Sequence, residues 1–190
     1  VENCTFSGTL SGTRCTGGIV GVNAASGVIR SCTTSGAAFG TNETGGIAGE
    51  NKGLVTGCTN GMYVNIESTD PQLTLDDLNL DFSLDLSLLT QFDTAGIATD
   101  TGGITGYSTG TVEACTNLAA VGYQHIGYNV GGIAGRSSGQ IRGCTNEGSI
   151  CGRKDVGGLV GQMEPYVELQ LSESLLSKLK TQLSELSGLI

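Results

Sequence analysis

Single apolar residues recur at regular intervals along much of the chain, each flanked by glycines and small polar residues. The pattern Gly-Gly-apolar-x-Gly occurs five times, starting at Gly17, Gly45, Gly102, Gly131 and Gly157, so successive starts are 28, 57, 29 and 26 residues apart. These stretches lack the period of about 3.6 residues of an amphipathic helix. Short apolar stretches at even spacing, with turn-forming residues between them, predict an all-β fold.

A second pattern, Gly-x-[Val/Ile]-x-x-Cys-Thr, lies between copies of the first. It contains Cys32, Cys58, Cys115 and Cys144, and Val1, Cys4 and Thr5 match its end. The first glycine of each pair precedes the next such cysteine by 15, 13, 13 and 13 residues, so the two patterns form one repeat. Stacked short repeats are typical of a solenoid, and we predict a right-handed parallel β-helix of about five coils.

Each coil is expected to hold three strands, at Gly-Gly-Ile-x-Gly, at Gly-x-Val/Ile-x-x-Cys and at a looser third position such as residues 148–151. Stacked coils place equivalent residues above one another at the ~4.8 Å spacing of strands, so inward positions form ladders. One predicted ladder contains Ile19, Ile47, Ile104, Ile133 and Leu159. A second contains Val1, Ile29, Val55, Val112 and Ile141.

A third predicted ladder contains Cys4, Cys32, Cys58, Cys115 and Cys144. In a straight strand each cysteine would face away from the Val or Ile three residues earlier, so both point inward only if the chain bends between them. The residues before the cysteines are small or turn-forming and permit that bend: Asn3, Ser31, Gly57, Ala114 and Gly143. Three asparagines that follow Cys-Thr are expected at left-handed turns: Asn60, Asn117 and Asn146.

The cysteines have three interpretations. Core packing is favoured, because free cysteine behaves as a small hydrophobic residue. Disulfides are a second, although side chains on stacked coils run parallel. Metal binding or catalysis is a third, but the sequence has no Cys-x-x-Cys and one histidine, His125, for which we expect a structural or exposed position. No metal-binding or cofactor-binding residue is predicted.

The long interval of 57 residues indicates about thirty extra residues, roughly 64–95, within an acidic segment, 61–100, that carries eight acidic and no basic residues. Leucines alternate with Asp and Ser over 73–89, which predicts extended structure, with a short helix over about 75–90 as the alternative. The segment holds −8 of the net charge of −9. An acidic chain is an unfavourable partner for nucleic acid, and no apolar stretch approaches the ~20 residues of a membrane span. We favour a solvated acidic face over a calcium site.

Residues 1–161 are therefore expected to form the solenoid, and residues 162–190 an amphipathic helix. Its apolar positions follow a heptad: Leu169, Leu176, Leu183 and Ile190. The helix is expected to cap the last coil, to join copies into a homo-oligomer, or to stand free. Terminal caps are common because an open solenoid end exposes unpaired strand edges.

The repeat resembles the GLUG type, through Gly158-Leu159-Val160-Gly161 and its four counterparts, over about residues 1–60 and 100–161. The resemblance implies a secreted or cell-surface bacterial protein. It also implies a non-catalytic module, such as an adhesin segment, stalk or interaction scaffold, whose partner is a surface glycan or protein of a host or bacterium. Because the GLUG-type repeat has no catalytic residues, the resemblance implies none in this chain.

A glycan-active enzyme on a similar β-helix is the alternative function. Such enzymes need acidic and basic side chains clustered on one face. Outside the acidic segment the most compact charged group is Arg153, Lys154 and Asp155. Three tyrosines are expected either on one exposed face, where they would offer a stacking surface for sugar rings, or scattered over the surface: Tyr107, Tyr123 and Tyr128.

Overall fold

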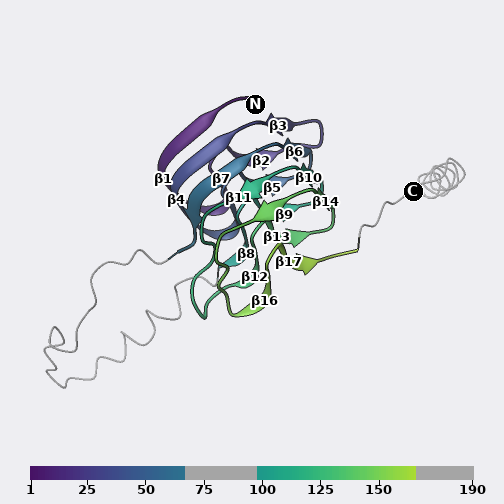
Figure 1. The fold of residues 1–190 in the computed structure, drawn as a ribbon. Helices are drawn as coiled ribbons and strands as arrows, with labels where there is room; N and C mark the ends of the chain where they lie inside the picture. The colour runs from purple at the N-terminus through teal and green to yellow at the C-terminus, as the bar shows by residue number, and fades with distance from the viewer. Residues whose placement is uncertain (67–97, 166–190) are drawn as a thin grey trace, which may run out of the picture.

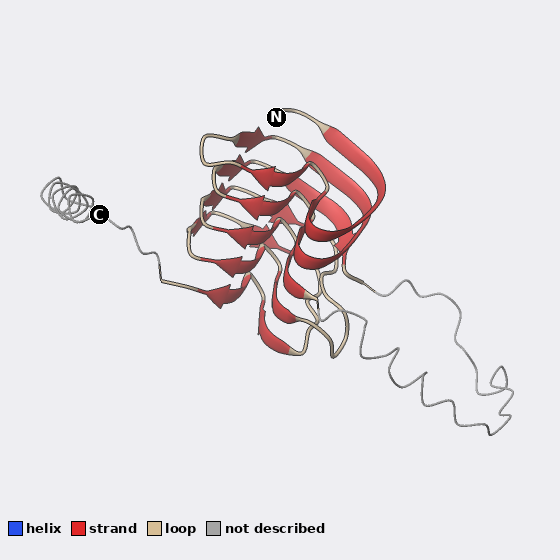
Figure 2. Cartoon of the chain, turned by 180° about the vertical axis from the view of Figure 1, so that it is seen from behind, coloured by secondary structure: helices blue, strands red, loops and turns tan. Residues whose placement is uncertain are grey.

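The chain folds as a parallel β-solenoid of about five coils, which confirms the predicted architecture at that level. The computed structural model describes residues 1–66 and 98–165. Within these ranges every element is a strand and none is a helix. Figure 1 shows the strands of successive coils stacked along one axis, and Figure 2 shows the same stack from behind.

Three parallel sheets, which we name A, B and C, run along the solenoid. Sheet A consists of β3 (Val28–Arg30), β6 (Leu54–Thr56), β10 (Thr111–Glu113) and β14 (Gln140–Arg142). Sheet C consists of β2 (Val20–Asn23), β5 (Ala48–Asn51), β9 (Thr105–Ser108), β13 (Ala134–Ser137) and β17 (Val160–Met163). Sheet B consists of β1 (Thr5–Gly17), β4 (Thr33–Gly45), β7 (Thr59–Val64), β8 (Thr99–Gly102), β11 (Thr116–Asn117), β12 (Tyr128–Gly131), β15 (Thr145–Asn146) and β16 (Lys154–Gly157).

The register between coils follows the sequence repeat. The threonine after each repeat cysteine pairs with its counterpart in the next coil, in the order Thr5, Thr33, Thr59, Thr116 and Thr145. On sheet A, Ile29, Val55, Val112 and Ile141 pair in the same way. One shared register therefore stacks equivalent side chains along the whole described solenoid.

The predicted bend before each cysteine is confirmed by the backbone. All five residues at this corner have positive φ: Asn3 (53°), Ser31 (52°), Gly57 (61°), Ala114 (50°) and Gly143 (58°). A left-handed residue turns the chain from sheet A into sheet B, so that the cysteine and the preceding Val or Ile both face inward. A second corner of this kind was not predicted, and it consists of Cys15 (50°), Glu43 (46°), Asp100 (54°), Asn129 (55°) and Asp155 (55°).

One predicted strand position is shifted and another is wrong. The Gly-Gly-Ile segments form the corner between sheets B and C, and each strand of sheet C begins one residue after the isoleucine or leucine. A Cβ on Gly46 would overlap the side chain of Asn60, so this corner needs glycine for close approach. Residues 148–151 contribute only an isolated bridge between Ile150 and Val121, whereas the third strand of each coil starts directly after the cysteine.

The core is a column of stacked apolar side chains between the three sheets. Its buried members include Ile29, Ile47, Val55, Ile104, Val112 and Ile133, together with the inner cysteines. A smaller cluster joins Val64, Val121 and Val130, with Ile150 packed against it. The larger cluster continues from coil to coil along the stack, as expected where each coil buries its apolar residues only against its neighbours, whereas the smaller one is confined to the later coils.

The extra residues enter the solenoid within sheet B. Ala38 pairs with Val64 and Asn42 pairs with Thr99, so three residues (39–41) in one coil correspond to 34 residues (65–98) in the next, an excess of 34 − 3 = 31. The excess agrees with the predicted thirty. Residues 61–64 and 99–100, which we assigned to the acidic segment, belong to β7 and β8. The strand or helix predicted over 73–90 lies outside the described residues.

The predicted C-terminal helix cannot begin at residue 162, because Gln162 and Met163 belong to β17. Its remaining length lies outside the described ranges, apart from residues 164 and 165. In the part of the chain that the structure describes, no helix is long and apolar enough to span a membrane.

Candidate functional site

The repeat cysteines lie in one column along the corner of sheets A and B. Cys32, Cys58 and Cys115 are buried, Cys144 is partly buried, and Cys4 in the first coil is exposed. The backbone N–H of Cys32 donates to Sγ of Cys58 over 3.4 Å, and that of Cys58 donates to Sγ of Cys115 over 3.4 Å. All of them are free thiols, so the column packs without disulfides.

Hydrogen bonds between the stacked thiols also set their acidity. Hydrogen bonding to Cys144 and Cys58, together with burial, raises the pKa of Cys115 far above its usual range. The hydrogen bond from Cys115 lowers the pKa of Cys144 to about 6. Among residues 1–66 and 98–165, no group of three or more His, Cys, Asp or Glu side chains is placed to hold a metal ion.

The isoleucine ladder is continuous along the backbone as well as the side chains. Ile19 donates its N–H to Ile47, Ile47 to Ile104, Ile104 to Ile133, and Ile133 to Leu159. Ile47, Ile104 and Ile133 are fully buried, Ile19 is partly buried, and Leu159 is 47% exposed. Leu159 differs because it belongs to the last described coil, where no further coil covers it.

A buried ladder of asparagine side chains was missed by the sequence analysis. Asn60, Asn117 and Asn146 lie in strands with ordinary φ values, so the prediction of left-handed turns is wrong. Each amide nitrogen donates to the next amide oxygen, from Asn60 to Asn117 and from Asn117 to Asn146, over 2.7 Å in both cases. Thr34 donates to Asn60 over 2.7 Å and begins the chain of hydrogen bonds.

The asparagine ladder explains why the second residue of these Gly-Gly pairs is a glycine. A Cβ on Gly103 or Gly132 would overlap the side chain of Asn117 or Asn146, as at Gly46 and Asn60. In these three coils the asparagine follows the second glycine by 14 residues (60 − 46, 117 − 103 and 146 − 132). That fixed spacing was the signal in the sequence for a contact across the core.

Among the residues that the structure describes, charged side chains are most concentrated around Arg136 on the outer face of sheet C. Its guanidinium donates to both carboxylate oxygens of Asp100, over 3.1 and 2.9 Å, and to Glu164 over 3.0 Å. It also lies 4.1 Å from the ring centre of Tyr107. Because Asp100 is only 5% exposed and is held by this bidentate pair, the group ties coils together and offers little to a ligand.

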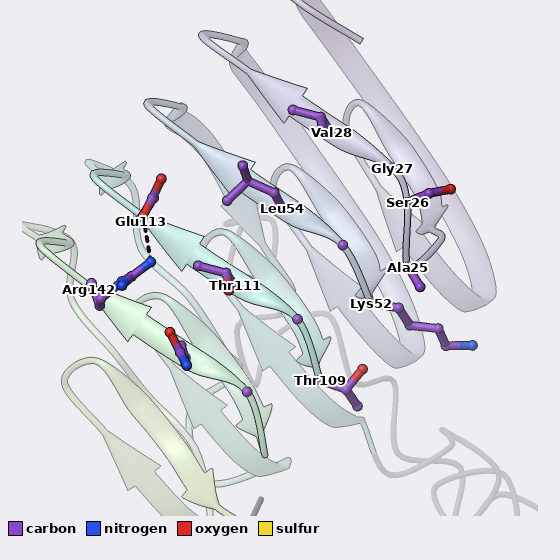
Figure 3. A pocket seen from close by; sticks show the side chains of 14 residues that line it. Ala25, Ser26, Gly27, Val28, Lys52, Leu54, Thr109, Thr111, Glu113 and Arg142 are labelled. Atoms are coloured by element: carbon purple, nitrogen blue, oxygen red, sulfur yellow. Dashed lines mark hydrogen bonds and ion pairs between the residues drawn. The ribbon is translucent and has the colours of Figure 1, made fainter. Parts of the chain in front are cut away.

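An open groove of about 510 Å³ runs along the outer face of sheet A. Its lining comes from four coils and includes Ser26, Val28, Lys52, Leu54, Thr109, Thr111, Glu113, Gln140 and Arg142. Figure 3 shows that the labelled side chains of the lining come from successive, parallel coils. The groove is therefore built from outward positions that the repeat duplicates once per coil.

Four glycines form the edge of this groove, one from each coil: Gly27, Gly53, Gly110 and Gly139. A Cβ on Gly110 would overlap the backbone of Gly53 in the preceding coil, and a Cβ on Gly139 would overlap Gly110. The glycines keep this edge free of side chains and let the coils approach closely.

The charged side chains of the groove are paired with one another or with near neighbours. Arg142 lies 3.0 Å from Glu113, and Lys52 lies 3.1 Å from Glu50, which is on sheet C. The remaining polar groups of the lining are the hydroxyls and amide of Ser26, Thr109, Thr111 and Gln140. The surface thus offers neutral hydrogen-bonding groups between internally balanced charges.

The residues proposed for other chemistry do not gather at this groove. Tyr107 lies on sheet C, Tyr128 on sheet B and Tyr123 in the connection between β11 and β12, so the tyrosines are scattered and do not form one face. Lys154 and Asp155 lie on β16, 3.8 Å apart and solvent-exposed, with Arg153 just before them. His125 lines a separate hollow of about 400 Å³ that also contains Cys151.

Comparison with known proteins gives no match: no protein-family model, curated protein or solved structure is similar to the chain. The GLUG-type resemblance therefore stays a prediction.

Proposed function

We propose that the chain is a non-catalytic interaction module in which the solenoid is a rigid scaffold and the groove of sheet A binds an extended ligand. The observation that carries this proposal is the continuity of the groove across four coils on one face. Linear ligands fit such a surface because each coil contributes side chains from the same outward positions. The ladders of buried side chains support the scaffold role, since they hold the coils in a single register.

The setting that we propose is the surface of a bacterium or its secreted material, with a right-handed GLUG-type solenoid as an adhesin segment or stalk. The support is the sequence resemblance together with the stacked coils. A surface glycan or surface protein is the corresponding class of partner. We also propose that the segment 162–190 caps the last coil of the solenoid or joins two copies of the chain into a homo-oligomer.

A glycan-cleaving enzyme is the competing function. Hydrolysis of glycosides generally requires two carboxyl groups that flank the scissile bond. Among the residues that line the groove, the carboxyl group is that of Glu113, and it is engaged by Arg142. The charged group at Arg153 and Asp155 lies in and beside β16 of sheet B, and neither residue lines the groove. These positions favour binding over turnover.

The proposal is tested with arrays of surface glycans and extracellular proteins, probed with the whole chain and two variants. Gln140→Trp places a bulky ring in the groove, whereas Gln162→Trp makes the same change at an exposed position of sheet C. We expect Gln140→Trp alone to abolish binding. Equal binding by both variants would rule out the groove, and polysaccharide turnover that is lost on changing Arg153 or Asp155 would establish the enzyme instead.

A further inference from the structure

The spacing of the groove constrains the repeat unit of its ligand. Neighbouring strands of sheet A are separated by ~4.8 Å along the solenoid axis. An extended peptide advances only ~3.3 Å per residue and falls out of step with the coils. A pyranose ring is about as long as the coil spacing, so a linear polysaccharide along the axis presents one sugar to each coil.

The side chains of the groove also suit sugar rings. Val28, which is 39% exposed, and Leu54 form an apolar part of the lining in the first two coils of sheet A. Thr111 and Gln140 occupy the equivalent outward positions in the next two coils. A pyranose has apolar C–H faces and hydroxyl edges, and this groove offers a partner for each.

The charges of the groove distinguish between kinds of polysaccharide. A polyanionic chain is held by cations that are free to form charge-assisted hydrogen bonds. Here Arg142 is engaged by Glu113 and Lys52 by Glu50, at 3.0 and 3.1 Å. An acidic polymer would have to displace these carboxylates, whereas a neutral polymer would not.

We infer that the groove of sheet A binds an uncharged linear polysaccharide, which lies along the solenoid axis and is recognised by neutral hydrogen bonds and C–H contacts. The inference rests on the proposed interaction function and names its ligand class. Gln140 is the residue of the lining whose amide is exposed and free of a charged partner at an outward position. It is therefore the position at which hydrogen-bonding specificity is tested.

The experiment measures calorimetric binding of the whole chain to two sets of soluble oligosaccharides, neutral glucan and mannan fragments and acidic uronic-acid fragments. It includes Gln140→Leu, which removes the amide at similar size, and the matched control Gln162→Leu on sheet C. We expect a neutral oligosaccharide to bind. Gln140→Leu should weaken it by about tenfold, the effect of one lost hydrogen bond, and Gln162→Leu should leave it unchanged. Raising the salt from ~50 to ~500 mM should alter the affinity less than about twofold.

The possible results distinguish a wrong ligand class from a wrong function of the groove. Preferential binding of acidic fragments, with steep salt dependence and sensitivity to Gln140→Leu, overturns the neutral class but keeps the groove as the binding surface. Binding of extended proteins alone, blocked by Gln140→Trp, overturns the polysaccharide class in the same way. If neither Gln140→Leu nor Gln140→Trp changes the binding affinity, the proposed function is overturned as well.

Discussion

Removal of one asparagine from the buried ladder gives a sharp test of how the coils are held together. Asn117 is fully buried; its amide donates to the backbone oxygen of Ala119 over 2.8 Å and to Asn146 over 2.7 Å, and its oxygen accepts from Asn60 over 2.7 Å. Asn117→Ala deletes all three hydrogen bonds. At roughly 1 kcal/mol each, the loss is ~3 kcal/mol, and the cavity left by the amide adds to it.

The assay is urea unfolding of the whole chain, followed by circular dichroism and by tyrosine fluorescence to test whether the two transitions coincide. Leu118→Ala is the matched control, because the neighbouring side chain is half exposed, at 50%, and its truncation should cost under ~1 kcal/mol. A loss below ~1 kcal/mol for Asn117→Ala, or one equal to that of Leu118→Ala, would show that the ladder is not a stabilising element.

Further predictions concern the glycine corner and the thiol column. Gly46→Ala should destabilise the chain by more than ~3 kcal/mol because its Cβ overlaps Asn60, whereas Gly158→Ala, with open space at the equivalent site, should be nearly neutral in the same unfolding assay. Cys115→Ser should lower stability by ~1–3 kcal/mol, because it buries a polar hydroxyl where the thiol packs among apolar side chains; an unchanged melting temperature would contradict the buried column. Alkylation of Cys144, followed by peptide mass spectrometry, should rise through a pH of about 6, as its lowered pKa requires, and a midpoint near 9 would contradict the hydrogen bond from Cys115. Since that folded pKa lies below the unfolded value of 9.0, the thiolate contributes its full stabilisation above about pH 9, and this contribution disappears as the pH falls towards 6.

The repeat in the sequence was enough to predict the stacked coils, because one register satisfies every copy at once. The spacing between Val or Ile and Cys even predicted the bend at Ser31, Ala114 and their equivalents, since no straight strand points both side chains inward. The thirty extra residues were likewise found from the interrupted period. These features depend on local geometry that each copy of the repeat carries.

Other features depend on contacts between coils that a single repeat does not reveal. Asparagine is common in turns, and only the stacked structure shows that Asn117 reaches its counterparts. The pattern treats all copies alike, yet Cys4 and Leu159 are exposed because each lies in a terminal coil of the described solenoid. The groove was not predicted either, since its outward positions vary from coil to coil in residue type and carry no motif.

The junction between Val64 and Thr99 has a practical consequence. Both flanking strands pair with β4 in unbroken register, although the connection grows from three residues to 34 at this point. The scaffold therefore tolerates a change of polypeptide length there without any shift in the pairing on either side. Protein engineers look for such sites when they graft a binding peptide or a whole domain onto a host. A sequence inserted at this position should therefore leave the contacts between the stacked coils unchanged.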